Sequence, residues 1–471
     1  MLLRRRARSE LRKLSTQLIL DLPDWEEWNW FEEVFDSIRS IRLVGPDLVL
    51  GKLFDEIGFN AVVEDTSELL RHLVIARLVA PGSKLKTVRY LKDYTERDYD
   101  TDQIYRHMDE LHSRHKTRIE QISYEHSLGV LGGKMSVVFY DVTTLYFEAD
   151  REDDLRKSGF SKEGKHKKPQ ILLGLLVSVD GYPLAYELFE GSKYEGHTML
   201  PVIEAFKKKY QLEQLVVVAD AGLMSSKNVE QLKVEGYEFI LGARIKNEST
   251  LIKNKILNLD LKDGQNKAIK KDKQLRLIIN YSKKRAAKDA YNRQRGLDRL
   301  EKNLAKGKLT KSHINKRGYN KYLKMQGDVQ ISIDYQKFEQ DAAWDGLKGY
   351  LTNSKLPTKL LVNTYRELWK IERAFRIAKT DLGIRPIYHR VPKRIEIHIC
   401  IAFMAYKVFK ELERQLKLKK VPLSTERAIE ILKTIQAVTI QHPKTGNFKN
   451  MMLIKTQQQQ QLLQAFDIPL G

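Results

Sequence analysis

Three acidic residues far apart in the chain, Asp141, Asp220 and Glu372, are the best candidates for chemistry. Carboxylate oxygens are the ligands that Mg²⁺ and Mn²⁺ prefer. Two such ions about 4 Å apart can activate a water or a 3′-hydroxyl and stabilise the leaving oxygen of a phosphodiester. If the fold brings these three side chains together, we expect phosphodiester chemistry that depends on Mg²⁺ or Mn²⁺.

Asp141 stands inside an apolar, aromatic run, VVFYDVTTLYFE, that predicts a β-strand over residues 137–148. Its neighbours two and four residues away share its face of the strand and are largely apolar. A carboxylate on such a face is costly unless it is paired or binds a metal. Taken alone, Asp141 is better explained as a structural aspartate bonded to nearby backbone.

Asp220 directly follows the wholly apolar run Leu215–Ala219, which predicts a central strand buried on both faces. Open α/β sheets bind ligands at the carboxyl ends of such strands. The alternative is an aspartate that only begins the turn at Ala221-Gly222.

Glu372 lies in the stretch YRELWKIERAFRIAK, residues 365–379, whose period predicts one continuous amphipathic helix. Tyr365, Glu372 and Lys379, seven positions apart, fall on the flank of the apolar stripe, with Arg376 close by. A solvated helix face is the alternative for any such helix alone. The stripe itself contains Leu368, Ile371, Phe375, Ala378 and Leu382.

The elements around these residues predict an α/β fold with a mixed sheet. Strands are expected at residues 171–179 and 182–189, joined by a two-residue Asp180-Gly181 hairpin turn. A helix at 198–208, the strand at 215–219, a helix capped by Ser225 or Ser226 and a strand at 237–241 follow.

The flanking segments predict further domains. Residues 1–130 read as mostly helical and suit a DNA-binding domain. The catalytic core is expected in two parts, 131–246 and 351–415, the second holding the Glu372 helix and a buried helix at 395–412. Between them, residues 247–350 predict an insertion with a charged helix at 282–306 and strands at 275–281 and 329–335. Residues 416–471 form a basic tail whose glutamine run, 457–461, predicts a surface helix or disorder.

The composition limits the classes of partner and the cellular compartment that we expect. Lys and Arg number 83 against 61 Asp and Glu, a net charge of +22, which favours polyanions and nucleic acid first. The single cysteine, Cys400, excludes an internal disulfide framework and a cysteine-based zinc site. No apolar run is long enough to span a bilayer and no secretory signal is visible, so we expect a soluble, cytoplasmic protein without a membrane partner.

Four blocks carry a resemblance to a known family: FYDVTTLYFE, GFSKEGKHKKPQILLGLLVS, VVVADAGLMSSKN and YRELWKIERAFRIAK. They resemble bacterial insertion-sequence DDE transposases of the group named for its Tyr-Arg-Glu-Lys signature, the insertion-sequence type-four superfamily. The resemblance covers about residues 137–409. It implies a ribonuclease-H-like mixed-sheet core in which Asp141, Asp220 and Glu372 hold two Mg²⁺ or Mn²⁺ ions, with an inserted mixed β/α domain and an N-terminal helical domain.

The resemblance also implies partners and further site residues. The partner would be double-stranded DNA, both the element's terminal inverted repeats and the target, bound by a homodimer associated with the nucleoid. Tyr365 and Lys379 would act beside the carboxylates. The expected DNA-binding residues are Arg366, Trp369, Arg373 and Arg376 on the signature helix and Lys165, Lys167 and Lys168 in a basic loop. The alternative for the loop lysines is a solvated loop, and the alternative for Trp369 is packing in the core.

One signature position departs from the family. The signature arginine corresponds to residue 368, which is leucine in this chain and is expected to pack in the core, leaving Arg376 nearest in phase. We also expect a shorter N-terminal segment than in other members.

The sequence therefore predicts a transposase that cuts the ends of its element and joins the freed 3′-hydroxyls to a target. Two alternatives stay open: a non-catalytic DNA-binding protein derived from a decayed transposase, and a ribonuclease-H-like nuclease without strand transfer. A tyrosine recombinase is a weaker alternative, since it rests only on the short pattern His115-x-x-Arg118.

Overall fold

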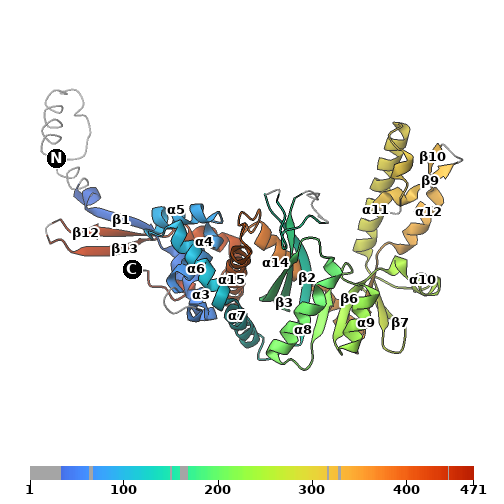
Figure 1. Cartoon of the computed structure of the whole chain (residues 1–471), viewed down its shortest axis with the longest axis horizontal. Helices are drawn as coiled ribbons and strands as arrows, with labels where there is room; N and C mark the ends of the chain where they lie inside the picture. Colours follow the sequence, from blue (N-terminus) through green and yellow to red (C-terminus); the bar gives the residue numbers. More distant parts are fainter. Residues whose placement is uncertain are drawn as a thin grey trace. The chain divides into compact units, whose positions relative to one another are not determined.

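The computed structural model of the chain describes residues 33–62, 67–148, 151–159, 168–315, 318–326, 330–443 and 445–470 (Figure 1). The chain divides into two compact units: residues 1–107 together with 411–471, and residues 108–410. The finer division into five segments stays a prediction.

An eight-stranded mixed sheet is the centre of the second unit, with strand order β4-β3-β2-β5-β6-β11-β8-β7. The strands β2 (Val137–Tyr146), β3 (Gln170–Ser178) and β4 (Pro183–Glu190) form an antiparallel meander. The strands β5 (Val216–Ala219) and β6 (Glu238–Ala243) run parallel to β2 on its other side. This order is that of a ribonuclease-H-like core, so the predicted fold class is confirmed.

Three further strands lengthen the same sheet beyond β6. Strand β11 (Leu347–Thr352) pairs antiparallel with β6 and also with β8 (Arg276–Tyr281), and β8 pairs with β7 (Asn266–Lys270). The strand predicted at 275–281 is thus present. Its place in the core sheet was not predicted, because strand order depends on pairing between segments about 110 and 70 residues apart.

Helices cover one face of the sheet, and a large apolar core lies between them and the strands. Helix α7 (Lys116–Val130) contacts β4, α8 (Met199–Tyr210) contacts β3 and β4, and α9 (Ser226–Val234) contacts β6. Ser225 caps α9 as predicted, since its hydroxyl accepts the N–H of Asn228 at 3.1 Å. Buried side chains that alternate along the strands, including those of Tyr140, Val217 and Phe239, belong to this core.

The opposite face is covered by α13 (Thr358–Arg366), α14 (Trp369–Lys379) and α15 (Pro392–Leu418). Helix α14 packs against β2 (Figure 1). Its Lys370 ammonium donates a 2.6 Å hydrogen bond to the carbonyl of Val179, in the β3–β4 turn. The hydroxyl of Tyr406 on α15 donates to the carbonyl of Gly181 in the same turn at 3.1 Å.

That turn differs from the predicted two-residue hairpin. Strand β3 ends at Ser178 and β4 begins only at Pro183, and the N–H of Gly181 donates back to the carbonyl of Ser178 at 2.9 Å. Pro183 has no N–H to donate to the ladder, and the register shifts next to it. The hairpin is present, but the predicted turn length is wrong.

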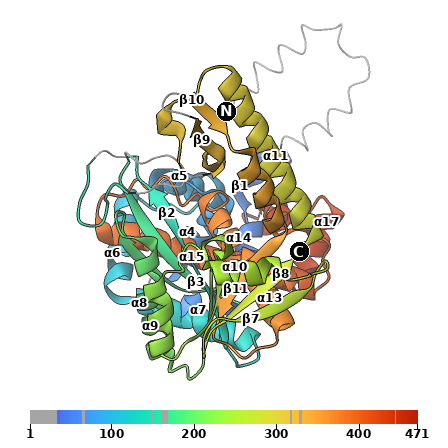
Figure 2. The same cartoon turned by 90° about the vertical axis from the view of Figure 1, so that its right-hand side faces the viewer.

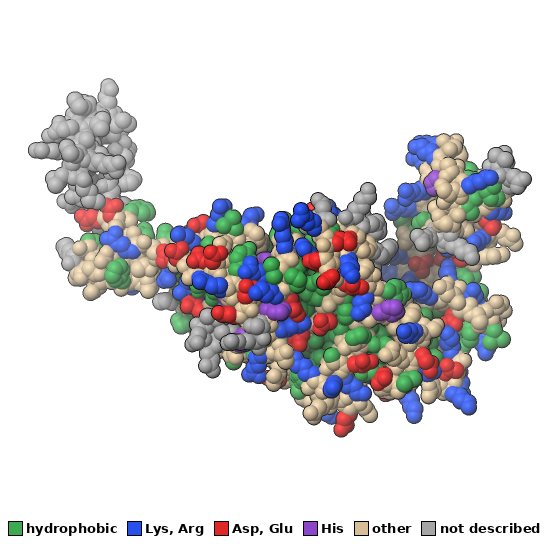
Figure 3. Space-filling model, in the orientation of Figure 1, with side chains coloured by type: hydrophobic (Ala, Val, Ile, Leu, Met, Phe, Trp, Pro, Cys, Tyr) green, Lys and Arg blue, Asp and Glu red, His purple; other side chains and the backbone are tan. Residues whose placement is uncertain are grey.

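The segment between β8 and β11 forms a small layer of its own around helix α11 (Lys283–Ala305), which matches the helix predicted at 282–306. Leu297 and Leu300 of α11 pack with Tyr322 in an apolar cluster. Figure 1 and Figure 2 both show α11 beside β9 and β10. Strand β9 is Leu323–Gln326 and β10 is Gln330–Ile333. The sequence of α11 contains eight Lys and Arg against three acids, and cationic side chains gather along its outer part (Figure 3).

In the described part of the first unit, helices occupy most of residues 52–107, and the helical domain predicted over residues 1–130 stays a prediction. The unit contains α3 (Lys52–Ile57), α4 (Ser67–Val79), α5 (Lys84–Thr95) and the start of α6 (Thr101–Arg114). An antiparallel sheet of order β1-β12-β13 was not predicted. Its strands are β1 (Ile38–Leu43), β12 (Gln436–Gln441) and β13 (Phe448–Leu453).

The glutamine run lies in helix α17 (Gln457–Ala465), so the helical alternative for this run is the one the structure forms. Gln459 is buried, which the prediction of a surface helix missed for this residue. Its amide donates to the hydroxyl of Thr434 at 2.8 Å and its carbonyl oxygen accepts the N–H of Thr456 at 2.9 Å.

In the part of the chain that the structure describes, no helix is both long and apolar enough to cross a membrane.

A carboxylate on α15 links this helix to α6 and α7 and gives a pH-dependent contribution to stability. The Lys116 ammonium donates to Glu396 at 2.6 Å, and a His112 ring nitrogen lies 2.9 Å from the same carboxylate. Burial would raise the pKa of Glu396, but the bonds and charge of Lys116 and His112 outweigh it and hold the pKa below its usual value. A carboxyl with a lowered folded-state pKa stabilises the protein above its unfolded-state pKa and loses that contribution as the pH falls through the folded-state value.

We therefore expect Glu396→Gln to lower the free energy of unfolding by about 1–3 kcal/mol at pH 7. The difference from the unmodified protein should shrink as the pH falls below the ordinary glutamate pKa of about 4.3. Urea unfolding at pH 7 and at successively lower pH measures it. The exposed Glu235→Gln is the matched control, and an equal effect of the two variants at pH 7 would contradict the assignment.

Candidate active site

Two of the predicted carboxylates lie on neighbouring strands at the same level. The parallel pairing of β2 with β5 runs up to Tyr140 opposite Ala219, and the next residues are Asp141 and Asp220. Parallel strands in register direct opposed side chains to the same face. Tyr140 faces the α8–α9 core, so Asp141 points to the other face, where α14 packs against β2.

Tyr365, at the end of α13, ties that helix to Asp220. Its side chain is 2% exposed, and its hydroxyl donates a 3.1 Å hydrogen bond to Oδ1 of Asp220. Burial, and after it the negative charges of Asp220 and Glu372, raise the pKa of the phenol far above its ordinary value. Tyr365 is therefore a neutral donor that holds one oxygen of Asp220.

Gly242 on β6 provides the space for this contact. A Cβ atom at residue 242 would lie 2.5 Å from the Tyr365 hydroxyl and 2.8 Å from the backbone nitrogen of Ala221. Neither distance is possible without movement, so glycine is required where the phenol passes the strand on its way to Asp220.

The predicted single helix over residues 365–379 is wrong. Helix α13 ends at Arg366 and α14 begins at Trp369. At the junction the backbone hydrogen bonds change from the α-helical spacing of four residues to a spacing of three: the N–H of Leu368 donates to the carbonyl of Tyr365 at 3.0 Å. Leu368 is 5% exposed, which confirms that it packs. The break turns Tyr365 into the sheet, so it is buried rather than on a solvent-facing flank.

Glu372 lies in the first turn of α14 with an exposed side chain. Its charge acts on Tyr365 and on Lys348, the same two side chains on which the charge of Asp220 acts. Lys379 is the last residue of α14, two turns and about 10 Å further along the helix axis.

The predicted DNA-binding residues of this segment are distributed around α13 and α14. Arg366 and Arg376 are exposed, Arg373 is half-buried, and the Trp369 side chain is 49% exposed. In the predicted basic loop, Lys168 is half-buried, whereas Lys165 and Lys167 lie outside the described residues.

Carboxylates are suitable ligands for a hard divalent cation, but the three side chains do not converge on one metal position. Within the described ranges, no group of three or more His, Cys, Asp or Glu side chains is arranged to hold a metal ion. Mg²⁺ commonly uses only one or two carboxylates and completes its shell with waters and phosphate oxygens. Asp141 and Asp220 would supply these carboxylates, and Glu372 would have to move toward them to become a third ligand.

Comparison with known proteins identifies the family of this chain. The family described as "Transposase DDE domain" matches residues 132–408, more than half of the chain. The chain belongs to the transposase DDE domain family.

Among solved structures, similarity is distant. A piggyBac transposase synaptic complex with hairpin DNA shares 11% identity, with a TM-score of 0.40 over 83% of this chain and 79% of that one. A Mos1 transposase paired-end complex with the left transposon end shares 13% identity, with a TM-score of 0.17 over 48% of this chain and 70% of that one. No curated protein matches the sequence.

The structure of this transposase-family chain adds a cation that the sequence analysis did not single out. Lys348 on β11 has its ammonium 4.7 Å from the centre of the Tyr365 ring and 5.7 Å from that of Tyr350. Burial and then the charge of Arg285 lower the pKa of Lys348, while Asp220 and Glu372 oppose that shift. The only signal in the sequence is a lysine two residues before Tyr350 in a short strand, which many surface strands share.

Substitution of Gly242 tests the Tyr365 contact. We expect Gly242→Ala to cost about 1–3 kcal/mol of unfolding free energy, because the new methyl group overlaps the phenol. Removing the nearest overlapping atom with Tyr365→Phe should reduce that cost, so the two substitutions together should be less damaging than their sum. Urea unfolding of the four proteins measures the coupling.

Gly222→Ala, in the turn after Asp220, is the matched control, because a Cβ there meets nothing within 4 Å. Its effect should be close to zero. Strictly additive effects of Gly242→Ala and Tyr365→Phe would contradict the packing described.

Proposed function

We propose that the chain is an active DNA transposase of the Tyr-Arg-Glu-Lys signature group of bacterial insertion sequences. In this proposal it cuts the ends of its element and joins the freed 3′-hydroxyls to target DNA. The observation that carries the proposal is the adjacent pair Asp141 and Asp220, with Tyr365 bonded to Asp220 and Glu372 on the helix that covers the same face.

In this proposal Asp141, Asp220 and Glu372 hold one or two Mg²⁺ or Mn²⁺ ions. When bound, the ions would activate the attacking water or 3′-hydroxyl and stabilise the leaving oxygen. Tyr365 keeps one oxygen of Asp220 occupied and so orients the second. Because the Glu372 side chain is exposed, we expect it to change rotamer on DNA binding and complete the set.

Cations beside the carboxylates would hold the DNA phosphates. Arg285 and Arg366 lie close enough to Lys348 for the charge of each arginine to act on it. Such positive charge next to a reacting phosphate stabilises the charge that develops in the transition state. The chain has Leu368 at the signature arginine position, so we propose that Lys348 supplies a positive charge there from the neighbouring strand, together with Arg376.

The carboxylates are tested by cleavage of duplex DNA that carries the sequences flanking the coding region. We expect Asp141→Asn, Asp220→Asn and Glu372→Gln each to reduce Mg²⁺-dependent strand cleavage by about a thousandfold or more while the duplex is still bound. Asp381→Asn, which removes an exposed carboxylate just after α14, is the matched control and should cleave normally.

Cleavage undiminished in Asp220→Asn would contradict the proposal. Binding without cleavage by the unmodified chain in Mg²⁺ and Mn²⁺ would favour the decayed, non-catalytic alternative. Cleavage without joined products when a target plasmid is supplied would favour the nuclease alternative.

Lys348 is tested in the same assay. We expect Lys348→Gln to slow single-turnover cleavage about 10–100-fold, the loss of one charge-assisted contact, and Lys348→Arg to recover part of the rate. Lys359→Gln, on the exposed side of α13, is the matched control. Equal rates for Lys348→Gln and Lys359→Gln would remove Lys348 from the proposed site.

A further inference from the structure

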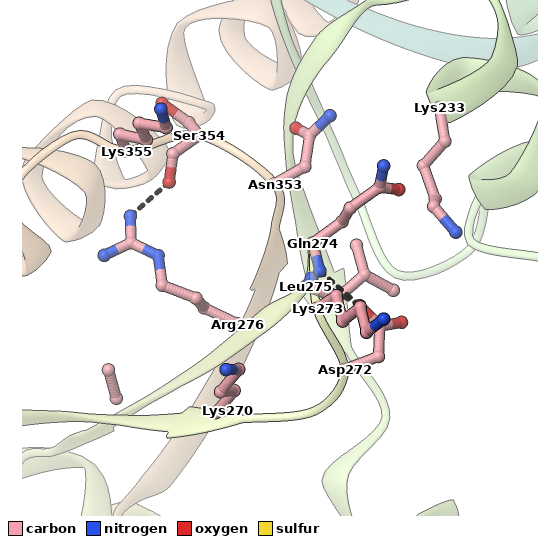
Figure 4. Close-up of a pocket in the computed structure, with 11 residues that line it drawn as sticks. Lys233, Lys270, Asp272, Lys273, Gln274, Leu275, Arg276, Asn353, Ser354 and Lys355 are labelled. Carbon is pink, nitrogen blue, oxygen red and sulfur yellow. Dashed lines mark hydrogen bonds between the residues drawn. The ribbon is translucent and has the colours of Figure 1, made fainter.

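A basic pocket of about 620 Å³ lies at one end of the extended sheet, apart from the carboxylates. Side chains from three segments line it: the β7–β8 hairpin, the end of α9 and the residues after β11 (Figure 4). Five of these side chains are cationic and one is acidic. The cations are Lys233, Lys270, Lys273, Arg276 and Lys355, and the acid is Asp272.

The frame of this basic pocket is fixed by hydrogen bonds. The Asp272 carboxylate accepts the N–H groups of Gln274 and Leu275, both at 2.7 Å, and so holds the hairpin turn. The Arg276 guanidinium donates to the carbonyls of Ser354 and Leu356, the latter at 2.9 Å (Figure 4). These bonds tie the hairpin to the segment after β11.

A second connection joins that segment to β6. The Asn353 side chain accepts the N–H of Phe239 at 2.9 Å and donates to the carbonyl of Tyr237 at 2.8 Å. Asp272, Arg276 and Asn353 are therefore engaged in the frame. What remains available to a ligand is the set of lysines.

Few acidic side chains neutralise the charge of those lysines. Lys270, Lys273 and Lys355 are exposed and make no ion pair with any described residue. Lys233 pairs with Glu230 on its own helix at 3.1 Å, and its charge also acts on Asp272. Like charges gathered around one cavity attract anions and release counterions when phosphates bind.

The location separates this pocket from the carboxylate site. Asn353 bonds to the first residues of β6, and Lys233 stands just before that strand. Asp220 follows the last residue of β5, and β5 begins opposite Glu238. Four residues along a strand correspond to roughly 13 Å, so the two sites are at opposite ends of the sheet.

We infer that the basic pocket is a second DNA site, which holds phosphates of a strand at the end of the sheet remote from Asp141 and Asp220. The inference rests on the proposed function for the identity of the polyanion. Lysines are flexible point charges that suit a phosphodiester backbone read without sequence. A site for one small anion would instead present an arginine fork or converging N–H groups, and the single arginine here is bonded to carbonyls.

The test compares two triple variants of the full chain in fluorescence-anisotropy titrations of a labelled duplex, without divalent metal, over a range of salt concentrations. The first changes Lys270, Lys273 and Lys355 to Gln. The second changes Lys208, Lys255 and Lys306, exposed lysines of the same unit outside the pocket, and so removes the same charge. Thermal unfolding verifies that all three proteins fold alike.

We expect the pocket triple to weaken binding about tenfold or more and to reduce the slope of log affinity against log salt by about 2–3, one ion per lost phosphate contact. The control triple should change the slope by less than about 1. Equal slopes for the two triples would overturn the inference while leaving the proposed function intact.

A titration with inorganic pyrophosphate alone provides a second outcome. Pyrophosphate binding that the pocket triple abolishes, with no change in the DNA salt slope, would assign the pocket to a small anion and overturn the inference. If the unmodified chain neither binds nor cleaves duplex DNA, both the inference and the proposed function fail.

Discussion

The parallel pairing of β2 with β5 is the constraint on which the candidate active site depends. It joins segments about eighty residues apart and ends with Tyr140 opposite Ala219, so that Asp141 and Asp220 come next to each other. A slip of one residue would send one of the two carboxylates into the apolar core on the α8–α9 face. The buried side chains around Tyr140 and Val217 oppose such a slip and therefore also hold the register of the carboxylates.

The second constraint is the break between α13 and α14. A continuous helix would keep Tyr365 and Glu372 on one flank, at a separation set by the helix alone. The break lets Tyr365 enter the sheet beside Gly242 and bond to Asp220, while Leu368 packs and α14 lies along β2. The buried phenol thus bonds to Asp220, while the exposed Glu372 lies on the helix that packs against β2. Lys348, on the strand next to β6, adds a cation to this group.

Local patterns were sufficient to predict most elements. The strand around Asp141, the apolar strand before Asp220, the serine-capped α9 and the charged α11 follow from period, composition and capping residues. What the sequence did not reveal depends on contacts between distant segments. The addition of β8 and β11 to the core sheet and the pairing of β1 with β12 are of this kind.

In the candidate site, too, local patterns were predictable and contacts between distant segments were not. Residue types and their order identified Asp141, Asp220 and Glu372, and the resemblance supplied Tyr365 as a neighbour. The helix break was not predictable, because residues 365–379 keep an apolar stripe that a straight helix would also satisfy. Lys348 and Gly242 were missed because each matters only through its distance to the Tyr365 ring or hydroxyl.

We propose that Asp141 and Asp220 share a divalent cation, and electron paramagnetic resonance of bound Mn²⁺ measures whether they do. The unmodified chain with a pre-nicked duplex should bind Mn²⁺ more tightly than Asp141→Asn or Asp220→Asn, and the double variant should be no worse than either single one. Independent, additive losses, or Mn²⁺ binding unchanged in both single variants, would show that the two side chains do not hold a common ion.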